Sequence, residues 1–180
     1  ENEVKKTALD VHKFRLTHDL VSLEENQNII AQALHQAQLD YDIAKKAATD
    51  LSRVALKVEQ SLADGVDIET IPHVADDPLI AGLKAKLIAD ESELVRLLER
   101  YKDKMPIVIA TRKQIEAEKT SIRDEANKVI ASLKQRVEIA KDQENAALAH
   151  LKLVEEDQHG LSEKKVKYDV LVRKSDRSHY

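Results

Sequence analysis

The chain has no cysteine, no tryptophan, one phenylalanine, one methionine and four tyrosines among its 180 residues. The lack of cysteine excludes disulfides and thiolate metal sites, although it identifies no compartment. Scarce aromatic side chains argue against an ordinary globular core, which usually depends on them for volume. Three glycines and three prolines leave room for few chain reversals. We therefore expect a small number of long helices.

The chain also lacks a large excess of charge of either sign. The net charge is −4, from 29 basic and 33 acidic residues that are interspersed along the chain. This mixture speaks against the electrostatic footprint of a nucleic-acid or anionic-lipid binder. No apolar run approaches the length of a membrane span, and no signal-peptide pattern opens the sequence. Charged residues make up 34% and apolar residues 42% of the chain, which is typical of long helices that bury a narrow stripe.

The first third of the chain carries a sustained seven-residue repeat, which predicts a coiled-coil helix over about residues 3–63 and about 90 Å long. Asp64-Gly65 is expected to end it. Small residues in the repeat allow a neighbouring helix to approach closely, and polar residues can set the register. One seam consists of Leu9, Leu16, Leu23, Ile30, Ala37, Ala44, Leu51 and Val58, and the other of Lys13, Leu20, Gln27, Leu34, Tyr41, Ala48, Ala55 and Leu62.

Two proline-containing breaks follow. Residues 64–77 show no sustained period and are expected to form a loop, and Asp77-Pro78 reads as an N-cap followed by proline at the first helical position. The second helix is predicted over 78–100. Its seven-residue row runs to Tyr101, and a tight turn is expected before Pro106.

A third helix is predicted over 107–157. Between Ala126 and Val137 its apolar residues are spaced by three, four and four, an eleven-residue element that locally unwinds a left-handed supercoil. Residues 158–160, which include Gly160, are a weaker break, read as either a reversal or a kink before a fourth helix over 161–178. The resulting fold class is all-α: a long antiparallel coiled-coil helical hairpin or bundle, forming one domain over 1–180. Because helical register is present at both ends, we expect a segment of a larger protein.

Nothing in the sequence points to catalysis, a cofactor or a metal. No two of the seven histidines have zinc-site spacing, and no glycine-rich phosphate loop is present. The carboxylates sit beside cations at helical spacing, as Glu116 and Glu118 do beside Lys119, and are expected on a solvated face. We therefore expect no enzymatic activity, no cofactor and no metal site in this chain.

Five segments form an ordered set: residues 14–28, 78–80, 99–108, 122–126 and 168–173, the last followed by Arg177 and Tyr180. In this order they resemble the periplasmic region of bacterial polysaccharide co-polymerases, the chain-length determinant and exopolysaccharide-transport proteins. The turn in that family commonly has histidine before the proline, where this chain has Met105, so a role tied to that imidazole is not expected.

The resemblance implies a periplasmic domain of an inner-membrane protein that forms homo-oligomers and controls polysaccharide chain length and export. Its implied partners are a polysaccharide polymerase and an outer-membrane exporter, with membrane anchors and, in some members, a cytoplasmic tyrosine autokinase lying outside this chain. The alternatives are the helical hairpin of a type I secretion membrane-fusion adaptor, a nucleic-acid-binding arm such as that of a tRNA synthetase, and a purely structural tether. The interspersed charges speak against nucleic acid.

One surface is singled out as a candidate for contact with another protomer or a partner protein. The turn supplies most of it, and the membrane-proximal block that the resemblance implies supplies the rest. Alternatively, the turn only connects two helices, and Tyr101 is the last residue of the heptad row. The candidate residues are Tyr101, Lys102, Asp103, Lys104, Pro106, Arg173 and Tyr180.

Overall fold

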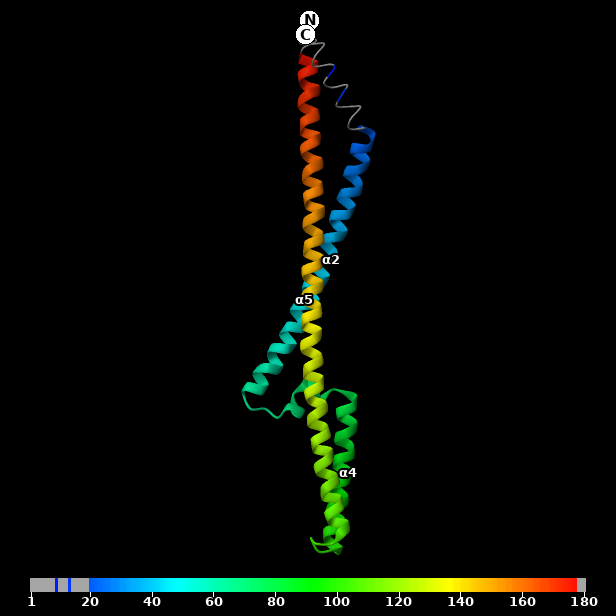
Figure 1. Cartoon of the computed structure of the whole chain (residues 1–180), viewed down its shortest axis with the longest axis vertical. Helices are drawn as coiled ribbons and strands as arrows, with labels where there is room; N and C mark the ends of the chain where they lie inside the picture. The colour runs from blue at the N-terminus through cyan, green and yellow to red at the C-terminus, as the bar shows by residue number, and fades with distance from the viewer. Residues whose placement is uncertain (1–8, 10–12, 14–19, 178–180) are drawn as a thin grey trace. The chain divides into compact units, whose positions relative to one another are not determined.

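The structure, a computed structural model, describes Leu9, Lys13 and residues 20–177. Within these residues every regular element is helical and no strand occurs, which confirms the all-α class. None of the described helices is long and apolar enough to cross a membrane. The expected start of the first helix near residue 3 lies outside the described range. The elements are α2 (Leu20–Ala63), the 3₁₀ helix η1 (Ile68–Thr70), α3 (Pro72–Ala75), α4 (Pro78–Arg100) and α5 (Pro106–Arg177) (Figure 1).

The chain divides into two compact units. The first comprises residues 1–46 and 142–180, and the second comprises residues 47–141. Helices α2 and α5 each contribute a segment to both units, whereas η1, α3 and α4 belong to the second unit alone. The expectation of a single domain over the whole chain stays a prediction.

The first unit is a pairing of α2 with α5. Ala37 is only 1% exposed and packs with Leu151 and Val154 of α5, and two further α2 residues, Leu34 and Tyr41, flank this cluster. The small alanine side chain lets the two helices come close, as its place in the heptad seam predicts. Lys165 Nζ donates a hydrogen bond to Gln27 Oε1 at 3.2 Å, so the polar seam position at Gln27 does have a partner on the facing helix.

The second unit contains the larger core, in which four segments converge. Its most deeply buried side chains, Ile80, Ile122, Leu133 and Val74, are each at most 1% exposed. Burying a single such side chain is worth roughly 1.5–3 kcal/mol, so this cluster is the main source of stability of the unit. The cluster consists of Val58 from α2, Ile71 and Val74 from the connection, Ile80 from α4, and Ile122, Ala126, Ile130 and Leu133 from α5.

The eleven-residue step lies in this convergence. Ala126, Leu133 and Val137 are buried as the spacing predicts, and Ile130 beside the half-buried Val129 is buried as well. In this unit α4 pairs with the earlier part of α5, where Lys86 meets Glu118, and α2 pairs with the later part, where Glu59 meets Lys134. Because the partner changes along α5, its apolar stripe must shift around the helix, and the extra step provides that shift.

Two helix ends follow the sequence prediction closely. Gly65 has a φ of +77°. Its N–H donates to Leu62 O at 3.1 Å, and the next N–H, of Val66, donates to Ser61 O at 3.0 Å, which together close α2 with a Schellman motif. At the start of α4 the Asp77 carboxylate accepts from the N–H groups of Leu79 and Ile80 at 2.9 and 3.2 Å.

Three predicted details are corrected. Residues 64–77 are not simply loop, because η1 and the single-turn α3 lie within them, and burial of Ile71 and Val74 holds this segment on the core. The seam position Leu62 is 38% exposed, since α2 ends one residue later. The third helix begins at Pro106, whose missing N–H suits a first turn.

The break predicted at 158–160, with a separate fourth helix after it, is wrong. Helix α5 continues without interruption for 72 residues. Gly160 has a helical backbone, and a Cβ built there would meet nothing within 4 Å. A glycine inside a helix costs only about 1 kcal/mol, which the continuing hydrogen bonds outweigh when no proline follows.

Gly160→Ala is therefore expected to raise the free energy of unfolding by about 0.5–1 kcal/mol, because alanine favours the helix that already exists there. Gly65→Ala serves as the matched comparison and is expected to lower it by about 1–2 kcal/mol, because it places a Cβ on a left-handed residue. Urea denaturation followed by circular dichroism measures both changes. Destabilisation by Gly160→Ala would contradict a continuous α5.

Ile122→Ala is expected to lower the free energy of unfolding by about 2–5 kcal/mol, since it opens a cavity where four segments meet. Ile139→Ala on the same helix is the control, because Ile139 is 48% exposed and its truncation should cost no more than about 0.5 kcal/mol. Similar losses for the two variants, measured by chemical denaturation, would show that the second unit does not depend on this cluster.

Candidate functional site

The turn between α4 and α5 carries most of the surface that the sequence singles out. Tyr101 ends α4 in an extended conformation, with its N–H donating to Leu97 O at 2.8 Å. Across the turn, Asp103 Oδ1 accepts from Arg112 Nη2 of α5 at 2.6 Å. The Asp103 carboxylate therefore ties the turn to α5.

Tyr101 is 42% exposed, whereas Leu97, one turn earlier on α4, is 8% exposed. Lys102, Lys104 and Pro106 are also exposed at this turn. We call the turn and the helix ends beside it, residues 95–113, the hairpin end. The structure thus brings five of the seven candidate residues together. Arg173 is exposed on the α5 segment of the other unit, and Tyr180 lies outside the described residues.

The hairpin end is basic and partly apolar, although the chain as a whole is acidic. Residues 95–113 contain six basic and two acidic side chains. Leu98, Met105 and Ile107, at 40%, 41% and 49% exposure, lie among them. The net charge of the whole chain does not reveal this local excess, because the basic residues are divided between the end of α4 and the start of α5. A shallow hollow lies here, lined by Leu98, Tyr101, Lys102, Asp103 and Lys104.

A buried carboxylate lies in the seam between α4 and α5. Glu118 is only 4% exposed, so its expected place on a solvated face is wrong. Its Oε1 accepts from Lys86 Nζ at 3.0 Å and from Gln114 Nε2 at 2.9 Å. Its Oε2 has no donor. The spacing could have revealed this, since Glu118 falls three residues after Ile115 and four before Ile122, on the apolar stripe.

Asp90 of α4 shares its electrostatic environment with this carboxylate. The hydrogen bond that a protonated Asp90 forms with Glu118 raises the pKa of Asp90 above its ordinary value of 3.8, and desolvation and the negative charge of Glu118 raise it further. The hydrogen bond from Gln114, reinforced by Lys86 and Asp90, lowers the pKa of Glu118 below 4.5 despite its burial. A protonated Asp90 can thus donate to the otherwise unpaired Glu118 Oε2, which an ionised Asp90 cannot do.

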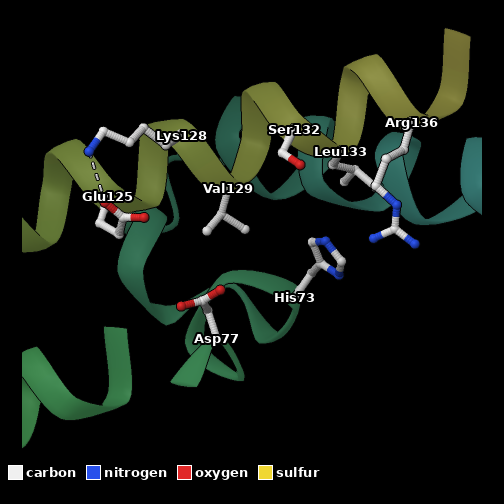
Figure 2. Close-up of a pocket in the computed structure, with 8 residues that line it drawn as sticks. All are labelled: His73, Asp77, Glu125, Lys128, Val129, Ser132, Leu133 and Arg136. Carbon is white, nitrogen blue, oxygen red and sulfur yellow. Dashed lines mark hydrogen bonds and ion pairs between the residues drawn. The ribbon is translucent and has the colours of Figure 1, made fainter. Parts of the chain in front are cut away.

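A second feature that the sequence did not reveal is a cleft of about 380 Å³ between the α3 region and α5. Figure 2 shows the imidazole of His73 and the guanidinium of Arg136 turned toward each other, with the Ser132 hydroxyl nearby. His73 is half-buried. The remaining lining residues are Asp77, Glu125, Lys128, Val129 and Leu133.

The described part of the chain holds no group of three or more His, Cys, Asp or Glu side chains placed to bind a metal ion. No protein-family model, curated protein or solved structure matches this sequence. What the chain does must therefore be argued from its own residues.

Asp90→Asn is expected to raise the free energy of unfolding at pH 7, because an amide can donate to Glu118 Oε2 without needing a proton. The raised pKa of Asp90 means that its protonated form favours the folded state, an advantage present below pH 3.8 and lost as the pH rises through the raised pKa. The gain should therefore shrink in acid, where Asp90 itself is protonated. Urea titrations across a pH series measure it.

Asp124→Asn is the control for charge alone, because Asp124 is an exposed residue of α5 without a contact to Glu118. An equal gain in this variant, or a loss of stability in Asp90→Asn at pH 7, would contradict proton sharing between the two carboxyl groups.

Proposed function

We propose that this chain is the periplasmic coiled-coil domain of an inner-membrane polysaccharide co-polymerase, and that it helps to control the chain length and export of a surface or secreted polysaccharide. The observation that carries the proposal is the uninterrupted α5. Its 72 residues include the buried apolar side chains against which α2 and α4 pack in their respective units. Such a helix suits a strut that holds other components apart.

In this proposal α2 and α4 pair with α5 as antiparallel coiled coils. The order of contacts supports it within each unit. In the first unit Gln27 contacts Lys165, and Ala37, further along α2, packs with Leu151, earlier on α5. In the second unit the ion pair between Lys86 and Glu118 lies nearer the turn than the packing of Ile80 in the core. The heptad seams supply the side chains that make this pairing stable.

The hairpin end would be the part of the strut that meets another molecule. Exposed cations and apolar side chains lie together there, and the ion pair of Asp103 with Arg112 ties the turn down. We assign to it contact with a neighbouring protomer or with an outer-membrane exporter, while Arg173 and Tyr180 would serve the membrane-proximal end beside the polymerase.

A type I secretion adaptor is the alternative that the same hairpin favours, because such an adaptor would also present an exposed turn between two helices. It differs in its flanks, which would be β-domains instead of membrane spans, and in its cargo. A purely structural tether would tolerate changes at the turn. Both alternatives predict that polysaccharide is unaffected when the turn is altered.

Reversing the charge of the turn in the full-length protein, by Lys102→Glu with Lys104→Glu, is expected to change polysaccharide chain length or the amount exported. Both side chains are exposed, so the fold should be preserved. Gel electrophoresis of the polymer and assay of secreted sugar measure the effect. The matched control is Lys164→Glu with Lys167→Glu, the same charge change at exposed positions of α5 away from the turn.

Deletion of the gene gives the reference phenotype for this comparison. A polymer whose length and secretion are unchanged in the deletion strain would overturn the proposal. Equal effects of the two double variants would show that the hairpin end has no special role.

A further inference from the structure

The cleft of Figure 2 brings together hydrogen-bond donors that lack acceptors. The cleft is lined by Arg136 and Ser132 of α5 and by His73 of α3. None of these three side chains has a hydrogen-bond or ion-pair partner within the described residues. A guanidinium and an imidazole that face each other gain nothing from that approach alone. An anion placed between them would accept from both.

The two carboxylates of the cleft are already engaged. Asp77 accepts from the first N–H groups of α4, where the helix dipole also offsets its charge. Glu125 is 22% exposed and pairs with Lys128 Nζ at 3.0 Å. The guanidinium of Arg136, by contrast, has no ion-pair partner among the described residues and is free to hold an anion.

The backbone on both sides of the cleft is firmly held. His73 lies between Pro72 and Val74, and Val74 is 0% exposed in the core of the second unit. On α5 the neighbour of Ser132 is Leu133, at 1% exposure, which fixes the rotation of that helix. Since the donors are carried by packed segments, the backbone beneath them needs little reorganisation to hold a ligand.

The size of the cleft points to a small organic anion. Its volume of about 380 Å³ exceeds what an inorganic ion needs and falls in the range of pockets for small molecules. The half-buried Val129 supplies an apolar wall beside the polar groups, with the buried Leu133 behind it. A ring or short chain that carries one acidic group matches this combination.

We propose that the cleft between α3 and α5 binds a small organic anion, with Arg136 and His73 holding its carboxylate or phosphate and Ser132 donating a further hydrogen bond. The apolar wall contacts the body of the ligand. This site rests on the geometry of the second unit alone, so it stands or falls separately from the role in polysaccharide assembly.

Titration of the ¹⁵N-labelled full chain, followed by NMR, tests the proposal with four probes: glucuronate, glucose 6-phosphate, inorganic phosphate and neutral glucose. Saturable shifts centred on residues 72–77 and 129–136 are expected with glucuronate or glucose 6-phosphate. The tighter of these two identifies the preferred acidic group. Inorganic phosphate should bind more weakly than glucose 6-phosphate, because it lacks a body to contact Val129, and neutral glucose should not bind.

Arg136→Gln is expected to weaken binding about tenfold or more, since it removes the charge that anchors the anion, and His73→Gln should weaken it to a smaller extent. Arg123→Gln is the matched control, an exposed arginine on the same helix outside the cleft. Circular dichroism verifies that all three variants keep their helix content.

Absence of shifts at the cleft with either organic anion would overturn the proposal. So would equal weakening by Arg123→Gln, which would indicate diffuse attraction to a basic helix, and so would equal binding of neutral glucose. Loss of binding in Arg136→Gln with full binding in Arg123→Gln would establish the site.

Discussion

Burial of the apolar stripe of α5 is the constraint on which the second unit depends. Ile122 and Leu133 are almost fully inaccessible, and each packs against side chains from other segments. Because successive residues are rotated by about 100° around a helix, a shift of one position would carry the stripe into solvent and break every one of these contacts. The register of α5 therefore determines where α4, α3 and the end of α2 can lie within this unit.

The polar features follow from the same register. Glu118 occupies a stripe position, so α4 must supply Lys86 and Asp90 opposite it, and only one alignment of the two helices does so. A buried charge of this kind costs stability, and its best-attested use is to select one register among several. The cleft has a different origin. It forms where the irregular connection before α4 packs on the regular helix α5 and leaves space beside His73.

The two proposals concern two different surfaces of the second unit. The hairpin end offers exposed cations with apolar side chains on a turn that the ion pair between Asp103 and Arg112 ties down, which suits contact with a macromolecule. The cleft offers unpaired donors around Arg136 on packed segments, which suits a small anion. Neither depends on proton transfer or a metal, and both follow from charges that the helices place side by side.

The sequence by itself determined the helical class and most helix ends, because seven-residue periodicity, Gly65 and Asp77-Pro78 act through local geometry. It also located the eleven-residue step. Only the tertiary structure decided that α5 runs through Gly160, because neighbouring turns outweigh the weak preference of one glycine. The partners of Glu118 on α4 and the approach of His73 to Arg136 likewise depend on which segments pack together, because contacts between residues far apart in the chain leave no local signal in its sequence.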